Sequence, residues 1–388
     1  MADQVYLDNG ASTRTDSRVV KAMLPYFTEQ FGNASSLHSY GVDAKEALTK
    51  ARSDISGFVG AQPEELIFTS SGTESNNLAI KGIAYANRNK GRHIIVSSIE
   101  HDCIINSCKW LETQGFEVSF MPVDRYGLVD PQQIASAIRK DTVIVSVMHA
   151  NNEIGTIEPI EEIGKICKER GVYFHTDACQ SFGKIRIDVN KMNIDLMTIN
   201  SHKIYGPKGV GALYIREGTT ITPIMHGGGQ EYGIRSSTEN IAGIVGFAAA
   251  VHLCADEIGT EPVRLTALRD RIIDGAMQIP GAYLNGHRTQ RLPTNVNLGF
   301  HNFEGEAITL MLKLNDHGFA VSTGSACSSN QAVNTPSHVL LAIGLNPIEA
   351  RGALRISLGR YNTKEEIDAL LEVLPSSVKS LRPISSMI

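Results

Sequence analysis

The chain contains a polar stretch between two apolar runs, Asn200-Ser201-His202-Lys203-Ile204-Tyr205-Gly206-Pro207-Lys208-Gly209. The runs on either side, residues 194–199 and 210–215, are typical of buried strands. Ligands of α/β proteins bind at strand ends, where a lysine with a lowered pKa can form a Schiff base with an aldehyde cofactor. A surface lysine in a hairpin would explain the stretch equally well, so other parts of the chain have to decide.

The overall composition is that of an ordinary globular protein. The 388 residues are 42% hydrophobic and 20% charged, and the net charge is −5, so the chain is long enough for two domains. This charge gives no indication of a nucleic-acid or membrane-surface binder. The N-terminus carries no signal segment, and the longest apolar run, 241–251, is too short to span a bilayer. We therefore predict a cytoplasmic protein.

None of the six cysteines forms a Cys-x-x-Cys pair. This spacing argues against a zinc or iron–sulfur site built from this chain alone. We predict free thiols in a reducing compartment and no intrinsic metal.

Strand and helix patterns alternate through most of the chain. The predicted strands cover 66–69, 93–97, 118–121, 142–148 and 172–176, and the predicted helices include 16–27, 41–58 and 159–170. Such units predict an α/β fold with a mainly parallel sheet flanked by helices.

The pattern changes after an apolar helix at 241–254. A boundary at 257–262 precedes a long helix near 264–278, short strands at 295–298 and 353–357, and a capping box at 363–366. We therefore predict a large domain, residues 15–258, and a smaller α+β domain, residues 1–14 and 259–388.

Several polar groups follow predicted strands and match what a lysine-bound pyridoxal phosphate (PLP) needs. Gly72 and Thr73 open a helix that could hold the phosphate, although they could form an ordinary helix cap. Asp177 could pair with the pyridine nitrogen or cap a helix. His101 could stack on the ring or be structural, and Asn152 could reach the ring oxygen, reach the substrate or sit in a turn. Because these residues and Lys203 all follow the carboxyl ends of predicted parallel strands, the cofactor interpretation is favoured.

A second region of interest runs from Ser322 to Pro336 and contains almost only small or polar residues. We predict a flexible loop there. Its cysteine, Cys327, is a candidate nucleophile because an exposed thiol on a loop is more reactive than a buried one. The other five cysteines lie in helical or strand patterns and are predicted to be packing residues.

The chain resembles the cysteine desulfurases of the NifS/IscS type, which are class V members of the fold-type I PLP enzymes. The resemblance covers essentially the whole chain. It rests on these motifs: Tyr6-Leu7-Asp8-Asn9, Gly32-Asn33-Ala34-Ser35-Ser36-Leu37-His38, Ser71-Gly72-Thr73-Glu74-Ser75-Asn76-Asn77, Glu100-His101, Asn151-Asn152-Glu153-Ile154-Gly155, His175-Thr176-Asp177-Ala178-Cys179-Gln180, the stretch around Lys203, His226-Gly227-Gly228-Gly229-Gln230, Ser325-Ala326-Cys327 and Arg355-Ile356-Ser357-Leu358-Gly359.

The resemblance implies a role for each matching residue. Lys203 would carry PLP, Asp177 would pair with the pyridinium nitrogen, Gln180 would bond the ring hydroxyl and His101 would stack on the ring. The phosphate would be held by Gly72, Thr73, Asn200, Ser201 and His202, with Thr238 reaching in from a second subunit. Asn152 and Arg355 would hold the substrate carboxylate, and Cys327 would take the sulfur. Asn200 departs from the pattern, because relatives often have a hydroxyl residue there.

The implied activity is conversion of L-cysteine to L-alanine, with transfer of sulfur to Cys327 as a persulfide. A homodimer and an acceptor such as an iron–sulfur scaffold of the IscU/NifU type are implied as partners. In that case Cys327 could also serve as a transient cluster ligand. A selenocysteine lyase or another class V enzyme is an alternative, and a catalytically silent scaffold protein is an alternative of a different class. The final sulfur acceptor stays open among iron–sulfur assembly, tRNA thiolation and cofactor synthesis.

Overall fold

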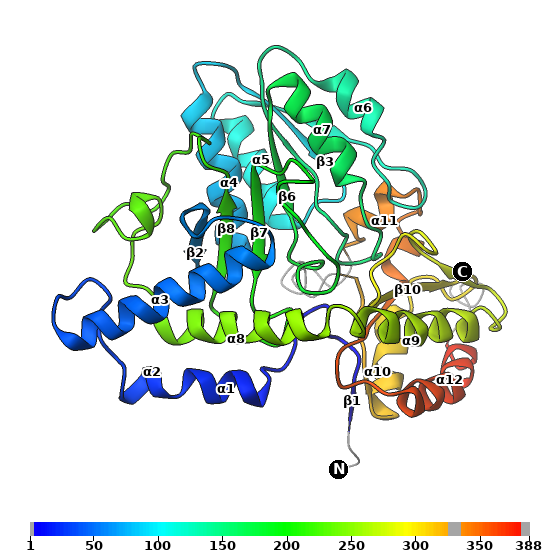
Figure 1. Ribbon diagram of the computed structural model, residues 1–388. Helices are drawn as coiled ribbons and strands as arrows, with labels where there is room; N and C mark the ends of the chain where they lie inside the picture. Colours follow the sequence, from blue (N-terminus) through cyan, green and yellow to red (C-terminus); the bar gives the residue numbers. More distant parts are fainter. Residues whose placement is uncertain (1–3, 325–334, 382–388) are drawn as a thin grey trace.

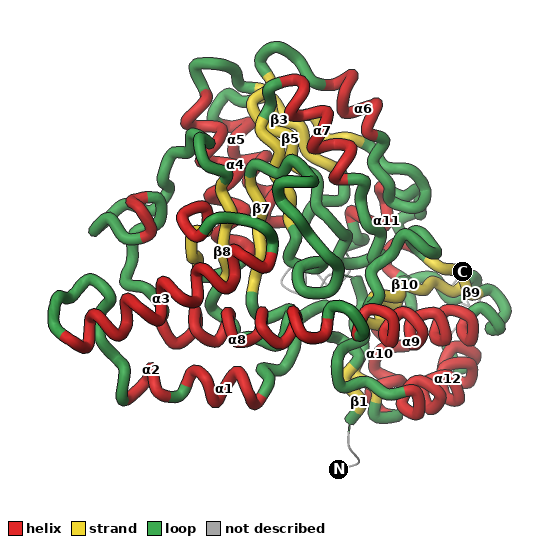
Figure 2. The backbone as a smooth tube through the Cα atoms, in the orientation of Figure 1, coloured by secondary structure: helices red, strands yellow, loops and turns green. Residues whose placement is uncertain are grey.

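The computed structural model describes residues 4–324 and 335–381, so Cys327 lies outside the described residues. A seven-stranded sheet forms the centre of the molecule, in the order β2-β8-β7-β6-β5-β3-β4 (Figures 1 and 2). Its strands are β2 (Leu66–Thr69), β3 (His93–Ser97), β4 (Glu117–Met121), β5 (Thr142–Ser146), β6 (Tyr173–Asp177), β7 (Leu196–Asn200) and β8 (Gly211–Ile215). The predicted α/β class is confirmed.

The sheet is parallel from β7 to β4, and β8 is its one reversed strand among the described residues. Because β8 pairs antiparallel with both neighbours, β2 and β7 run in the same direction. Gly211 of β8 lies opposite Thr69 on one side and Asn200 on the other. The carboxyl ends of β2 and β7 therefore reach the same edge of the sheet as that of β6.

Two groups of helices cover the two faces of this sheet. One face packs on α4 (Gly72–Asn87) and α5 (Asp102–Thr113). The other packs on α3 (Ser39–Phe58), α6 (Pro131–Ala137), α7 (Ile160–Arg170) and α8 (Ile241–Glu257). Most of the strands are buried along their whole length, which explains their near-continuous apolar sequences.

A separate apolar cluster forms the core of the C-terminal part. Here β9 (Ala282–Leu284), β10 (Asn295–Phe300) and β12 (Leu354–Ser357) form an antiparallel sheet, beside α9 (Glu261–Ala276), α10 (Ala307–Asp316) and α12 (Lys364–Lys379). The start of the chain joins this part, since β1 (Val5–Tyr6) pairs with β11 (Phe319–Ala320). Figure 1 shows β1 beside α10. The exact domain limits, 15–258 against 1–14 with 259–388, stay a prediction.

Two expected elements differ in the structure. The helix predicted over 16–27 is divided into α1 (Ser17–Met23) and α2 (Pro25–Thr28), because Pro25 has no N–H to continue the first helix. The strand predicted over 142–148 ends at Ser146.

The predicted capping box of α12 is confirmed, since Thr363 and Glu366 cap each other's backbone N–H groups.

No single helix among the described residues is long and apolar enough to cross a bilayer. Only α8 and α9 taken together pass the same test of length and composition, and these two helices are bent by 78° relative to each other.

Candidate active site

Lys203 lies in the turn between β7 and β8, at the carboxyl edge of the sheet. The turn is tight: Tyr205 has a left-handed φ of 68°, and a Cβ on Gly206 would lie 1.9 Å from Ser201 Oγ. Lys203 Nζ donates to the carbonyl oxygens of Gly10 and Ala11. The N-terminal segment therefore forms one wall of the lysine site.

Asp177 is the last residue of β6 and is buried. One of its oxygens accepts a hydrogen bond from Asn76 Nδ2 at 2.7 Å, and the other accepts from the backbone N–H of Cys179 at 2.9 Å. Because both donors are fixed, one on α4 and one on the chain after β6, the carboxylate has a defined orientation.

Gln180 and Lys184 form a chain of contacts that reaches Lys203. Gln180 Nε2 donates to the Gly10 carbonyl at 3.0 Å, and Gln180 Oε1 accepts from Lys184 Nζ at 3.4 Å. Lys184 and Lys203 also line one small cavity. Burial lowers the pKa of Lys184 to about 7, and the positive charge of Lys203 contributes to this shift.

The start of α4 forms a cradle with the end of β7. Ser71 caps the helix, and Gly72 and Thr73 are its first residues. A Cβ on Gly72 would lie 2.6 Å from Cys179 Sγ, so this backbone position needs glycine for close packing. Asn200 Oδ1 and Ser201 Oγ are buried and have no hydrogen-bond partner in the described structure.

This cradle meets the requirements of a phosphate group. A helix N-terminus offers backbone N–H donors to an anion. The unpartnered Ser201 hydroxyl can donate to such an anion, whereas the unpartnered atom of Asn200 is its amide oxygen, which can only accept. Buried polar atoms without partners are rare in native proteins. The residues present therefore fit the phosphate end of PLP.

His101 is the N-cap of α5, where its Nδ1 accepts from the backbone N–H of Cys103 at 3.2 Å. The same nitrogen lies 3.1 Å from Cys103 Sγ, and that sulfur is 3.2 Å from Asn76 Nδ2. His101 is thereby connected to Asp177 through Cys103 and Asn76. His202 contacts Ser12 Oγ at 3.2 Å, and burial lowers its pKa to about 4 with help from nearby lysines.

Arg355 lies on β12 of the C-terminal part and is 1% exposed. Its guanidinium donates to Asp8 Oδ1 at 2.9 Å, to the Asn152 carbonyl at 3.2 Å and to Ser322 Oγ at 3.3 Å. Its Nε has no partner in the described structure. Arg355 therefore contacts the backbone of Asn152 and keeps one unsatisfied donor among the described residues; their shared role in binding the substrate carboxylate stays a prediction.

Two predicted residues are not joined to this site in the described chain. Thr238 is exposed, in the segment between the short helix η2 (Glu231–Gly233) and α8. Cys327 lies outside the described residues.

Several residues at the site were not predicted from sequence. The carbonyls of Gly10 and Ala11, the Asn76 amide and the Lys184 amine all contact predicted site residues. Two thiols also belong here: Cys103 is only partly buried against His101, and Cys179 lies in a turn rather than in a helix or strand. The expectation that the five other cysteines pack in the core holds for Cys108, Cys167 and Cys254, which are buried.

The sequence profile described as aminotransferase class V matches residues 5–370. The chain belongs to this family. Enzymes of class V depend on PLP, in agreement with the cradle described above, and the predicted cofactor is confirmed. The family assignment also confirms that the chain is an enzyme.

Several relatives with long alignments are described as the cysteine desulfurase IscS. The cysteine desulfurase IscS of Methanosarcina thermophila is 53% identical over 383 residues, which is 99% of this chain and 94% of that protein. The cysteine desulfurase IscS of Dictyoglomus turgidum is 51% identical over 387 residues, covering 99% of this chain and 97% of its own. The predicted NifS/IscS resemblance is confirmed.

Solved structures of class V proteins superpose on nearly the whole chain. A NifS-like protein matches with a TM-score of 0.90 and 38% identity, covering 97% of this chain and 100% of its own. SspA in complex with cysteine matches with a TM-score of 0.82 and 39% identity, covering 92% of this chain and 100% of its own.

Proposed function

We propose that this protein is a cysteine desulfurase that converts L-cysteine to L-alanine and transfers the sulfur to Cys327. The observation that carries the proposal is the connected set of side chains at the carboxyl edge of the sheet, where Lys203, Gln180 and Asp177 lie beside an anion cradle. The desulfurase relatives at 53% and 51% identity support the substrate class.

The chain's own residues would hold PLP at both ends. Lys203 would be the attachment point, Asp177 would pair with the pyridine nitrogen, Gln180 would bond the ring hydroxyl and His101 would stack on the ring. The phosphate would be held by Gly72, Thr73, Asn200, Ser201 and His202. When bound, PLP supplies an electron-withdrawing ring that stabilises negative charge at the substrate α-carbon.

Lys203 moves the proton in this proposal. Its Nζ would accept the substrate α-proton and later return a proton. The carbonyls of Gly10 and Ala11 orient the amine by accepting its hydrogen bonds. Lys184 places a second amine beside the same small cavity, and the positive charge of Lys203 helps burial to lower the Lys184 pKa.

Arg355 and Asn152 would bind the substrate carboxylate. Arg355 is already fixed by Asp8, Ser322 and the Asn152 carbonyl, so it loses little side-chain entropy when a ligand arrives. A guanidinium matches the two oxygens of a carboxylate better than an ammonium does.

Cys327 would be the sulfur acceptor. The Cβ–S bond of the substrate breaks and an S–S bond to Cys327 forms, so L-cysteine and the enzyme thiol give L-alanine and the enzyme persulfide without another oxidant or reductant. A thiolate is the reactive form for attack on sulfur. The persulfide sulfur then passes to an acceptor, for which an iron–sulfur scaffold protein is our first candidate.

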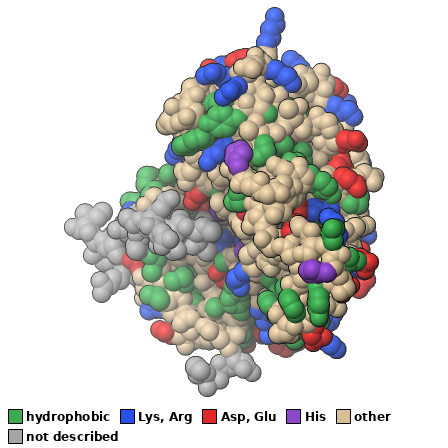
Figure 3. Space-filling view, turned by 90° about the vertical axis from the view of Figure 1, so that its left-hand side faces the viewer, with side chains coloured by type: hydrophobic (Ala, Val, Ile, Leu, Met, Phe, Trp, Pro, Cys, Tyr) green, Lys and Arg blue, Asp and Glu red, His purple; other side chains and the backbone are tan. Residues whose placement is uncertain are grey.

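We also propose that the enzyme acts as a cytoplasmic homodimer. Large apolar side chains are exposed on α2, between α2 and α3, at the start of α3 and in η2, and exposed apolar surface often marks an interaction site. These are Phe27, Phe31, Leu37, Tyr40 and Tyr232. Figure 3 views the molecule from the side where these elements lie and shows hydrophobic side chains on its lower half. Thr238 is exposed in the neighbouring segment and could reach a second subunit's phosphate.

The test uses Cys327→Ser and Lys203→Ala. The first variant should bind PLP and cysteine but form no persulfide, because a serine hydroxyl is a poor attacker of sulfur. The second should lose covalently bound cofactor and alanine formation, whereas Lys208→Ala, a change at an exposed lysine of the same stretch, should retain both.

Persulfide mapping by mass spectrometry and alanine assays read out these variants. Full alanine production by Cys327→Ser, with persulfide on another cysteine, would exclude the proposed acceptor. Selenocysteine as the preferred substrate would favour the lyase alternative, and purified protein without PLP absorbance would favour a silent scaffold.

A further inference from the structure

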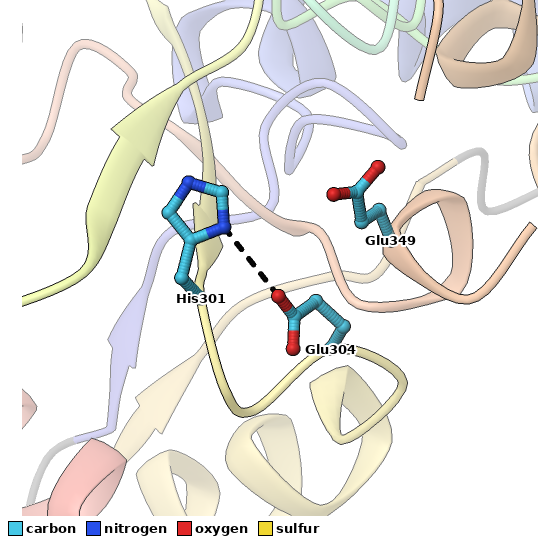
Figure 4. A group of neighbouring side chains, drawn as sticks. All are labelled: His301, Glu304 and Glu349. Carbon is cyan, nitrogen blue, oxygen red and sulfur yellow. Dashed lines mark hydrogen bonds and ion pairs between the residues drawn. The ribbon is translucent and has the colours of Figure 1, made fainter. Parts of the chain in front are cut away.

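A cluster of metal-ligating groups lies outside the site described above, in the C-terminal part of the molecule. His301 and Glu304 belong to the loop between β10 and α10, and Glu349 opens the short helix η4 (Glu349–Arg351). One ligand atom from each residue lies within 4.8 Å of the other two. Figure 4 shows Glu349 facing the other two side chains from its own helix.

The Glu304 carboxylate is not satisfied by its protein neighbours. Its side chain is 13% exposed, and its nearest cationic candidate is His301 Nδ1 at 3.4 Å from Oε1. Its second oxygen, Oε2, is buried and has no hydrogen-bond partner. Within the described residues, neither Glu304 nor Glu349 forms an ion pair with a lysine or arginine. Because two partly buried carboxylates lie close together without a lysine or arginine partner, a cation between them would reduce their mutual repulsion.

The three side chains are held in place by close packing of their two segments. A Cβ on Gly352 would lie 2.6 Å from Gly305 N and 3.0 Å from Glu304 Cα, so the backbones are in direct contact. The Tyr283 ring lies 4.5 Å from the His301 ring at an interplanar angle of 31°. Glu349 Oε2 accepts from the backbone N–H of Asn346 at 2.8 Å, which leaves the other oxygen for a ligand.

We propose that His301, Glu304 and Glu349 bind one divalent transition-metal ion, of the class of Mn²⁺, Fe²⁺ or Zn²⁺. Two carboxylates balance the charge of such an ion, and an imidazole favours it over Ca²⁺ or Mg²⁺. The His301 side chain is 57% exposed, so water can fill the remaining coordination positions.

The ion would connect two segments that are far apart in the chain, since Glu349 follows Glu304 by 45 residues (349 − 304). It would fix η4 to the loop that precedes α10. β12, with Arg355, begins three residues after η4 ends (354 − 351). We therefore assign the ion a structural role: it would hold the segment that leads into β12, the strand that carries Arg355. It would take no part in the chemistry of sulfur transfer.

Mn²⁺ titration of the PLP-loaded, chelator-treated enzyme tests this site. Mn²⁺ is the suitable probe because it prefers oxygen and nitrogen ligands to the thiols of this chain. Loss of the free-ion electron paramagnetic resonance signal should give one bound ion per chain. Pulsed spectra should show coupling to one imidazole nitrogen.

Three variants decide the assignment. Glu304→Gln, which conserves shape, should weaken Mn²⁺ binding by about tenfold or more, and His301→Ala should remove the nitrogen coupling. His317→Ala, a change at an exposed histidine at the end of α10, should bind Mn²⁺ like wild type.

Two results would overturn the proposal. The first is equal Mn²⁺ affinity of wild type and Glu304→Gln, and the second is no binding to wild type at about 1 mM, the weak end of the range for protein metal sites. If His301→Ala fails to fold, the nitrogen coupling of the wild-type spectrum still distinguishes the site from a purely carboxylate one.

Discussion

Glu231 and Arg52 form a buried ion pair whose loss should be costly. Their side chains are 1% and 7% exposed, and two hydrogen bonds of 2.6 and 2.7 Å join them. Glu231 Oε2 also accepts from the backbone N–H of Phe68 at 2.7 Å. The pair therefore fixes η2, and with it the segment leading to Thr238, against β2.

Glu231→Gln is the perturbation that tests this pair. The amide keeps the shape of the side chain but presents donors to Arg52 or Phe68, which offer only donors themselves. Breaking one member of a buried pair costs about 3–5 kcal/mol, because the remaining charge is uncompensated. Three charge-assisted hydrogen bonds of about 1.5–3 kcal/mol each would add up to a larger loss of unfolding free energy. Contributions of neighbouring groups are not additive, so the measured loss should stay below that sum.

Urea unfolding, followed by circular dichroism and by fluorescence of Trp110, measures this free energy. The double variant Arg52→Met with Glu231→Leu should regain part of the loss, since a buried pair can be replaced by apolar groups at little cost. Recovery is incomplete because the Phe68 N–H loses its acceptor. Glu117→Gln, at the exposed Arg139–Glu117 pair, is the control and should leave the midpoint almost unchanged. A Glu231→Gln variant within about 1 kcal/mol of wild type would refute the reasoning.

Three further outcomes follow from the site. Asp177→Asn should fold and lose at least about 100-fold in turnover, because its neutral amide no longer stabilises a protonated ring; near-normal turnover in a variant fully loaded with PLP would argue against the pairing. Ser201→Ala should weaken PLP binding by about tenfold without unfolding the chain, since its hydroxyl has no partner among the described residues; an unchanged affinity in equilibrium dialysis would remove it from the cradle. Burial lowers the pKa of Lys184 to about 7 in the folded state. Above that pH the unfolded state binds more protons at this lysine than the folded state does. Wild type should therefore gain stability relative to Lys184→Met as the pH rises from about 7 towards about 10. Urea midpoints at several pH values measure this difference, and a constant difference would contradict the shift.

The sequence predicted the strands of the large sheet well because each apolar run is bounded by polar residues. Leu66–Thr69 and His93–Ser97 have the expected limits. The residues that follow strands, such as Asp177 and Lys203, could be predicted for the same reason, since the carboxyl ends of parallel strands share one edge.

Other parts of the site depend on contacts that local pattern does not contain. The carbonyls of Gly10 and Ala11 reach Lys203 across more than 190 residues of chain. Asn76 was visible in a motif, but only its direction on α4 shows that it contacts Asp177. Lys184 resembles a solvated lysine in sequence, and its burial follows from the packing of the turn that contains it. The antiparallel direction of β8 could not be predicted from the sequence either, because a buried strand has the same composition whichever way it runs.

The pairing of β1 with β11 has a consequence for synthesis of the chain. Val5 leaves the ribosome long before its partner Phe319, with 314 residues (319 − 5) between them. At ordinary elongation rates this is a wait of about 15–60 s. Gly10 is without its hydrogen-bond partner for longer, because its backbone N–H donates to Ser357 Oγ, which is synthesised after Phe319. The sheet around Lys203 can assemble while the carbonyls that orient this lysine are still unplaced, so we expect nascent chains stalled before β12 to retain no PLP after gel filtration.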